Sequence, residues 1–297
     1  MVESSESCSD LIDGVLVIDK PQGLTSHDVV AVARRALGER RIGHTGTLDP
    51  LATGVLPLAC GRATRLVRFL TASDKEYQAT VRFGMTTDSY DVTGTETSRS
   101  GLRPNRDAVT RALAALTGRY LQTPPAFSAK KVAGRRAYDM ARREQPVELS
   151  PVPVMVTTAE LEAFTVDTAQ VRLVCSAGFY VRAFAHSLGE LTETGACLEA
   201  LRRTRSGEFT LDEANALEQL ISGVPPAALV TMDRLLRALP AVTVSEEGRK
   251  RVSRGQEVEG ASGTADWVRL MDGDGRLLAM ARPGTRPGLL HPAVVLI

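Results

Sequence analysis

The chain has 297 residues, of which 43% are hydrophobic and 24% are charged, as in folded globular proteins. Its formal net charge of +1 excludes a global positive field, so any surface for a polyanion must be a local basic patch. Four scattered cysteines without a C-x-x-C spacing give no pattern for a disulfide framework or a zinc site. An acidic first segment and the lack of a long apolar run predict a cytoplasmic protein with no signal peptide and no membrane span.

The N-terminal segment predicts a buried strand followed by a turn and a helix. The apolar run Gly14–Asp19 is short enough for a strand, and the proline and glycine within Lys20–Ser26 indicate a turn. Ser26 is placed to cap a helix over Asp28–Leu37, which Gly38 ends. Lys20, which opens the turn, has two candidate roles, a contact with RNA and a structural ion pair, and we expect the ion pair.

The segment Gly43–Gly61, GHTGTLDPLATGVLPLACG, has the most distinctive pattern in the chain. Asp49 is its only carboxylate, preceded by glycines that relax the backbone and followed by Pro50, which fixes the chain direction. Such a loop can present a single acid to a bound molecule. An aspartate before a proline also caps turns, and the local pattern alone favours this capping interpretation.

An arginine-rich helix and a strand are predicted next. A helix over Ala63–Thr71 would place three arginines at three-residue spacing on one face: Arg62, Arg65 and Arg68. Such a face is either a solvated surface or a surface that contacts phosphate groups, and we favour phosphate contact. Lys75–Val81 predicts a strand, and Phe83–Gly94 predicts a loop. We expect the side chains of Asp88 and Asp91 to form hydrogen bonds with the backbone of this loop and not to coordinate a metal.

The middle of the chain predicts further helices and strands around one basic segment. Arg106–Thr117 is an amphipathic helix opened by Asn105, and Ala159–Phe164 and Ala169–Ser176 are strands that return to the sheet. Between them, Phe127–Arg143 holds six basic residues against one acidic residue and two interleaved aromatic residues. A charge run is usually a solvated surface, but this composition suits a surface that follows a phosphate backbone.

The C-terminal part changes in character. Gly178–Gly189 starts a helix, and Leu201–Phe209 (LRRTRSGEF) is again basic. Val242–Ile297 is glycine-rich, with several short strand-like runs separated by turns, which predicts a small β-rich domain.

Several of these segments together resemble the TruB-type pseudouridine synthases, which isomerise uridine 55 in the T arm of tRNA. GHTGTLDPLATGVLP resembles the active-site segment of that family, and KPQGLTS its first motif. K-x-Y at residues 75–77, followed by the glycine–aspartate loop, resembles the second motif, while GFYVR and LRRTRSGEF resemble two later ones. Two positions depart from the family pattern: Phe179 stands where a small residue is common, and Ser187 replaces an acid.

The resemblance implies roles for single residues. Asp49 is expected to be the nucleophile, and Arg182 the guanidinium that keeps it ionised and oriented. Tyr77 is expected to stack on the flipped base and to receive the C5 proton, and His44 to occupy the space that the base leaves. The remaining expected substrate contacts are Tyr180 and Leu201.

The resemblance also implies an RNA surface. The basic segment corresponds to a thumb-like insertion at about residues 124–150 that grips the T loop, and the expected contacts to the RNA backbone are Lys130, Lys131, Arg135, Arg136, Arg202 and Arg203. The domains expected are a catalytic one over residues 1–238 and a small PUA-like RNA-binding one over residues 239–297. A generic β-barrel cap is an alternative for the second domain.

The fold expected from the resemblance is α+β, with a mixed, largely antiparallel sheet flanked by helices. Because the isomerisation gains no group and transfers no electrons, we expect no cofactor and no metal. The partner expected is the T stem-loop of tRNA, bound by a monomer without an obligatory protein partner. Two alternatives remain open: a guide-RNA-dependent synthase of the dyskerin type, and a non-catalytic protein that binds or folds tRNA.

Overall fold

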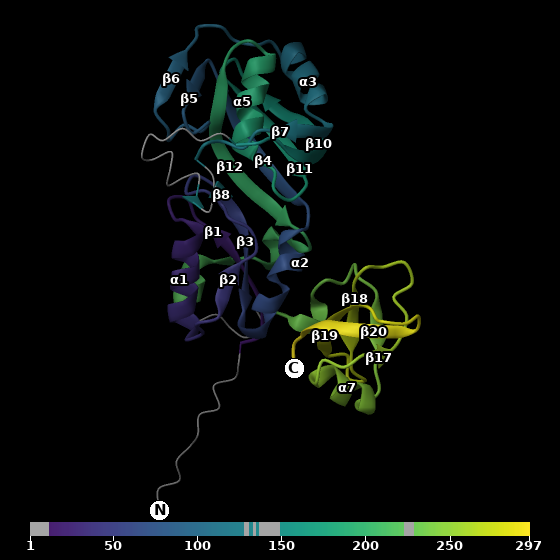
Figure 1. Ribbon diagram of the computed structural model, residues 1–297. Coiled ribbons are helices and arrows are strands. Elements are labelled where there is room, and N and C mark those ends of the chain that lie inside the picture. Colours follow the sequence, from purple (N-terminus) through teal and green to yellow (C-terminus); the bar gives the residue numbers. More distant parts are fainter. Residues whose placement is uncertain (1–11, 128–130, 133–134, 137–148, 223–228) are drawn as a thin grey trace, which may run out of the picture.

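The computed structural model describes residues 12–127, 131–132, 135–136, 149–222 and 229–297. Within these ranges, the strands form an 11-stranded mixed sheet, a 5-stranded sheet near the C-terminus and two 2-stranded ribbons. Helices flank the large sheet, and the small sheet lies beside it (Figure 1). The predicted fold class, a mixed and largely antiparallel α+β fold with a β-rich C-terminal part, is confirmed.

The large sheet has the strand order β14-β1-β3-β12-β4-β11-β10-β7. The strands in this order are β14 (Asn215–Ala216), β1 (Gly14–Lys20), β3 (Thr53–Cys60), β12 (Ala196–Ser206), β4 (Lys75–Phe83), β11 (Thr168–Cys175), β10 (Val152–Phe164) and β7 (Gly118–Gln122). Three short strands pair at the side: β2 (Ile42–His44) with β3, β13 (Phe209–Thr210) with β12, and β15 (Leu229–Thr231) with β1. Only the pairs β1–β14 and β3–β12 run parallel along this path.

The predicted strand at the centre of the sheet shows the expected alternation. Along β4, Tyr77, Ala79 and Val81 are buried, while Gln78 and Arg82 are exposed. The buried side belongs to the main hydrophobic core, which helices α3 (Arg106–Ala115) and α5 (Val181–Leu191) cover (Figure 1). This side of the sheet therefore carries the site described below.

The first helix, α1 (Ser26–Leu37), is capped by a different residue from the one predicted. Thr25 is the N-cap, and its side chain accepts a hydrogen bond from the Asp28 N–H at 3.1 Å. The carboxylate of Asp28 accepts in return from the Thr25 N–H at 2.8 Å, which completes a capping box. Ser26 lies within the helix and is fully buried. Because Thr25 provides the cap, the Ser26 hydroxyl binds another part of the chain, the backbone of Leu48. Gly38 ends the helix in the left-handed conformation, as predicted.

Part of the segment predicted as a loop is a strand. Residues Thr53–Cys60 form β3, which pairs with the whole of β1 in antiparallel register. Pro57 lacks an N–H, which argues against a central strand. It is tolerated because it lies between the positions where β3 pairs with β2, from Leu58 onward, and with β12, at Thr53 and Gly54.

The remaining elements of the described chain outside the C-terminal sheet are short. They are the ribbons β5 (Met85–Thr87) with β6 (Glu96–Arg99) and β8 (Lys131–Val132) with β9 (Arg135–Arg136), and helix α6 (Leu217–Ile221). Short 3₁₀ turns lie at η2 (Leu211–Glu213) and η4 (Met232–Arg234). No helix within the described ranges is long and apolar enough to cross a bilayer.

The C-terminal sheet has the order β16-β18-β19-β20-β17. Its strands are β16 (Ala241–Thr243), β18 (Val268–Met271), β19 (Leu277–Pro283), β20 (Leu289–Val295) and β17 (Val258–Glu259). A helix that the sequence analysis did not predict, α7 (Glu246–Ser253), follows the cap Ser245. Its sequence EEGRKRVS buries only Val252 and has no apolar stripe, so hydrophobic periodicity could not reveal it.

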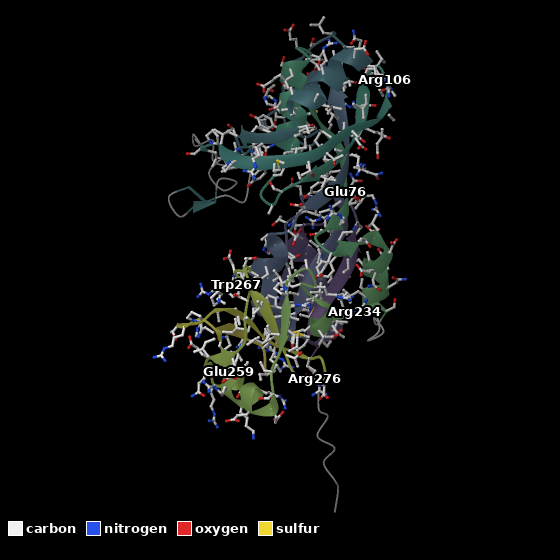
Figure 2. The ribbon with its side chains drawn as sticks, turned by 90° about the vertical axis from the view of Figure 1, so that its right-hand side faces the viewer. Glu76, Arg106, Arg234, Glu259, Trp267 and Arg276 are labelled. Carbon is white, nitrogen blue, oxygen red and sulfur yellow. The ribbon has the colours of Figure 1, made fainter. Side chains whose placement is uncertain are left out.

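Two arginines of the predicted arginine face, Arg65 and Arg68, attach the C-terminal sheet to the large one. The face lies on the 3₁₀ turn η1 (Gly61–Leu66) and helix α2 (Val67–Thr71). Arg65 donates to the carbonyl of Val295 at 2.5 Å, and Arg68 lies 4.7 Å from the centre of the Trp267 ring. Figure 2 shows Trp267 on the side of the C-terminal sheet that faces the rest of the chain. Arg62, the third arginine that we favoured for phosphate binding, pairs instead with Asp13 through its Nε at 2.7 Å.

We predict that Arg68→Ala loosens this junction. The variant removes a guanidinium that stacks on Trp267 and on Phe69, each at 4.7 Å, and we expect a loss of about 1 kcal/mol of unfolding free energy. Trp267 is the only tryptophan, so its fluorescence emission should shift to the red. Arg254→Ala, at the exposed end of α7, is the matched control, and equal emission and stability of the two variants would contradict the docking role.

Candidate active site

The site is built around the loop between β2 and β3, which carries Asp49. The hydroxyl of Ser26 accepts a hydrogen bond from the Leu48 N–H at 2.8 Å and donates to the Leu48 carbonyl at 3.1 Å. The carbonyl of Asp49 accepts from the Ala52 N–H at 3.0 Å, and that of Pro50 from the Gly23 N–H at 2.8 Å. Helix α1 and the turn before it therefore hold the loop on both sides of Asp49.

Arg182, at the start of α5, meets Asp49 directly. Its Nε lies 2.8 Å from Oδ2 of Asp49, and its other nitrogens donate to the carbonyls of Ser89 at 3.0 Å and Phe127 at 2.8 Å. The Arg182 side chain is 8% exposed and that of Asp49 40%, so the carboxylate remains accessible while its partner is buried. The structure thus brings together the two residues that sequence spacing could not connect.

A second carboxylate lies on the other side of Arg182. Oδ2 of Asp91 is 3.6 Å from Nη1 of Arg182, and Asp91 is 4% exposed. Its Oδ1 accepts from the Thr93 N–H at 2.9 Å and from the Ser89 hydroxyl at 3.1 Å. The predicted backbone contact is confirmed, but the bridge to Arg182 was missed. Only the fixed spacing of the T-D-x-x-D-x-x-G loop could have hinted at it.

Tyr77 lies on β4, opposite Arg203 on β12. It is 8% exposed, and burial raises the pKa of its hydroxyl above 10, while the contact with the Arg203 guanidinium opposes this shift. The hydroxyl is therefore neutral at physiological pH. Leu201, also 8% exposed, lies on the same side of β12, two residues before Arg203.

His44 and Tyr180 lie at two edges of the site. The His44 ring meets the edge of His27 at 5.3 Å, and burial, then the charges of His27 and Arg203, lower its pKa below 6.5. His44 is therefore mainly neutral at pH 7. Tyr180 is the N-cap of α5, and its backbone exchanges hydrogen bonds with the Gln122 side chain at 2.9 and 3.0 Å.

Two cations are buried behind the loop, each bound to carbonyl oxygens. Nζ of Lys20 donates to Leu24 at 2.6 Å and to Pro21 at 2.8 Å, and no carboxylate of the described chain lies within ion-pair distance. The predicted structural ion pair of Lys20 is therefore wrong, because backbone carbonyls satisfy the ammonium. Arg203, 1% exposed, donates to Val55 at 2.7 Å and to Gly46 at 3.1 Å.

The predicted RNA-backbone contacts fall into three groups. Arg203 is 1% exposed and donates inward to Val55 and Gly46, so a phosphate contact is excluded in this conformation. Arg202 is partly exposed but pairs with Asp19 at 2.7 and 3.0 Å. Lys130 lies outside the described residues, and Lys131, Arg135 and Arg136 are described only as backbone of β8 and β9.

The described residues offer no cluster of three or more His, Cys, Asp or Glu side chains that could hold a metal. What the site does offer is one accessible carboxylate, fixed by a buried guanidinium, beside a tyrosine, a leucine and a neutral histidine. This set can place an ionised oxygen against a flat, uncharged ligand held by apolar and aromatic contacts.

We predict a pH effect from the burial of Lys20. Burial lowers its pKa from 10.5 to about 8, although the charge of Asp49 opposes this. Between these values the unfolded chain binds the proton and the folded chain does not, so raising the pH favours folding. Denaturant unfolding should show that wild type gains stability over Lys20→Met by on the order of 1 kcal/mol per pH unit in this window.

Lys250→Met, which removes an exposed lysine of α7, is the matched control for this measurement. A difference between wild type and Lys20→Met that stays constant from pH 8 to pH 10.5 would show that the ammonium is not desolvated.

Comparison with known proteins gives consistent matches. The model of the TruB family pseudouridylate synthase N-terminal domain matches residues 34–181. The tRNA pseudouridine synthase B of Solibacter usitatus (strain Ellin6076) is 44% identical over 294 residues, which covers 96% of this chain and 100% of the relative. That of Thermobifida fusca (strain YX) is 40% identical over 297 residues, covering 96% and 99%.

Solved structures match over nearly the whole chain at lower identity. A chain of a Cbf5-Nop10-Gar1 complex superposes with a TM-score of 0.75 at 25% identity, covering 96% of this chain and 85% of that one. A chain of an H/ACA RNP bound to a substrate RNA containing 2'-deoxyuridine gives 0.75 at 24% identity, covering 97% and 86%. The latter likeness supports the fold alone.

Proposed function

The chain belongs to the TruB family of pseudouridylate synthases, and on this basis we propose that it converts uridine 55 in the T arm of tRNA to pseudouridine with Asp49 as nucleophile. The observation that carries the proposal is the 2.8 Å contact between the half-exposed Asp49 carboxylate and the buried Arg182. The substrate class follows from relatives at 39–44% identity that are named tRNA pseudouridine synthase B.

The reaction breaks the bond from ribose C1′ to N1 of uracil and forms the bond from C1′ to C5. C5 loses a proton and N1 gains one, so no electron or group is exchanged with another molecule. An ionised carboxylate can attack C6 of the base, attack C1′ of the ribose, or assist departure of the base, and each of these routes uses the Asp49 oxygen. Arg182 keeps the carboxylate paired and oriented through its Nε contact at 2.8 Å when a bound nucleotide covers the site.

The target base must leave the stack before Asp49 can reach it, at a cost of roughly a few kcal/mol. Tyr77 and Leu201 supply the surface that receives the base, and Tyr180 lines the opposite edge at the start of α5. The neutral ring of His44 occupies the space in the RNA stack that the flipped base leaves. Because the Tyr77 hydroxyl is neutral, it can take up the C5 proton only after it gives up its own.

The rest of the chain serves RNA binding in this proposal. Residues 1–238 form the catalytic domain, with the basic insertion at about residues 124–150 gripping the T stem-loop, and residues 239–297 form a PUA-like domain. Arg202 can contact the RNA backbone only if it releases Asp19. Arg203 is buried and supports the Asp49 loop through the carbonyls of Gly46 and Val55. The protein works in the cytoplasm as a monomer without an obligatory protein partner.

Two other functions fit the observations less well. A guide-RNA-dependent enzyme would resemble the Cbf5 chains most, yet their identity to this chain is 23–25%, against 39–44% for the tRNA pseudouridine synthases B. A protein that only binds or folds tRNA would not need an ion pair presented beside a tyrosine. We therefore retain the stand-alone tRNA enzyme as the proposal.

We predict that Asp49→Asn abolishes pseudouridine formation, because an amide lacks the ionised oxygen, while affinity for tRNA changes by less than about threefold. The measurement is incubation with unmodified tRNA transcript, without any guide RNA, followed by chemical labelling that maps pseudouridine to the nucleotide. Activity retained in Asp49→Asn would refute the nucleophile assignment. A wild-type enzyme that needs a guide RNA would refute the stand-alone function.

We also predict that Asp91→Asn slows single-turnover conversion about tenfold, equivalent to about 1.4 kcal/mol, with unchanged tRNA affinity. Without the Asp91 carboxylate, Arg182 interacts more strongly with the Asp49 carboxylate, and this makes the Asp49 oxygen a weaker nucleophile. Asp88→Asn is the matched control, since its carboxylate accepts from the Thr95 N–H in the same loop but does not touch Arg182. Equal rates for the two variants would refute a contribution of Asp91 to the reaction.

A further inference from the structure

The loop between β5 and β6 lies across one face of helix α5. Arg182, His186 and Glu190 follow each other at four-residue spacing, so they lie on the same face of that helix. Arg182 binds the loop at Ser89 and Asp91, as described above. One helical turn further on, His186 meets the residue between these two.

That residue is Tyr90, whose ring stacks on His186. The ring centres are 4.0 Å apart and the planes differ by 7°, so the two rings lie face to face. Nε2 of His186 lies 3.6 Å from the carboxylate of Glu190, which is one helical turn further along α5. Both rings are only half-buried, so the stack contributes little to the hydrophobic core.

The backbone of Tyr90 is strained. Its φ of +65° lies in the left-handed region, which a bulky side chain rarely adopts. Glycine would occupy this position without strain. Within the described chain, only two other residues besides glycines have positive φ, Glu193 and Leu236. A tyrosine kept in such a conformation points to a function of its side chain.

The strained residue holds the loop at the point where it contacts Arg182. The carbonyl of Tyr90 accepts from the Leu198 N–H at 2.9 Å, and the Leu198 carbonyl accepts from the Val92 N–H at 2.9 Å. Tyr90 is thus tied to β12 through its backbone and to α5 through its ring. The Ser89 carbonyl and the Asp91 carboxylate, which flank it, are placed by these two attachments.

We propose that the Tyr90–His186 stack positions Ser89 and Asp91 against Arg182, and through Arg182 sets the placement of the Asp49 carboxylate. Tyr90 and His186 are positioning residues that touch neither substrate nor Asp49. The inference rests on the proposed function and adds to it a structural cause for the geometry of the Asp49–Arg182–Asp91 bridge. No residue of the catalytic loop itself takes part in the stack.

The test is Tyr90→Gly, which removes the ring and the backbone strain together. If the Tyr90 side chain only stabilised the fold, a variant that is still stably folded would keep the wild-type rate of pseudouridine formation. We expect the melting temperature to be equal or higher, tRNA affinity to change by less than twofold, and the single-turnover rate of pseudouridine formation to fall at least fivefold. Tyr90→Phe restores the ring and is expected to recover most of the lost rate.

The matched control is Glu193→Gly, because Glu193 is an exposed residue with a φ of +56° just beyond the end of α5. It relieves a similar strain far from Arg182 and should leave the rate as in wild type. Amide hydrogen exchange supplies a second readout: the amides of Val92 and Leu198 should exchange at least tenfold faster in Tyr90→Gly.

The possible results distinguish failure of the positioning role from failure of the proposed function. A wild-type rate in Tyr90→Gly overturns the inference, and so does a rate loss that parallels a loss of melting temperature or that Tyr90→Phe does not recover. If the wild-type enzyme forms no pseudouridine in tRNA, the proposed function fails. Hydrogen exchange then decides the positioning role by itself, and unchanged exchange of Val92 and Leu198 overturns it.

Discussion

The ion pair between Asp49 and Arg182 is the contact on which the arrangement of the other elements depends. A guanidinium that is 8% exposed is costly to bury unless its donors are satisfied. Here they reach the carboxylates of Asp49 and Asp91 and the carbonyls of Ser89 and Phe127. These partners come from segments far apart in the sequence, so the pair can form only when the sheet, α5 and both loops are in place.

Rigidity beneath Asp49 comes from backbone contacts that leave no room for larger side chains. Gly54 has a φ of +99°, and a Cβ atom there would lie 2.2 Å from the Arg203 carbonyl. Arg203 in turn spans the loop, from Gly46 before Asp49 to Val55 after it. The loop is therefore fixed from below by a buried cation and from the side by Ser26. A carboxylate fixed in this way needs little reorganisation when a nucleotide arrives.

The C-terminal sheet is attached to the same framework rather than tethered loosely. Met280 and Leu296 share a hydrophobic cluster with Val15 and Val55 of the large sheet. The arginines of η1 and α2 close this junction at its rim, through Val295 and Trp267. A surface for RNA on the C-terminal part would thus keep a constant distance from Asp49, which a flexible linker could not provide.

The sequence alone determined local features: the alternation that makes β4 a strand, the cap Asn105 and the terminator Gly38. Motif resemblance added Arg182 as the partner of Asp49. Local pattern failed at Ser26, Lys20 and the arginine face, and the motif resemblance failed at Arg203. The sequence does not show whether a hydroxyl or a cation will contact water, phosphate or the carbonyl of a distant residue. Only the tertiary structure decides that partner, since burial and long-range contacts, such as those of Asp91 and Tyr90 with α5, arise when the chain has packed.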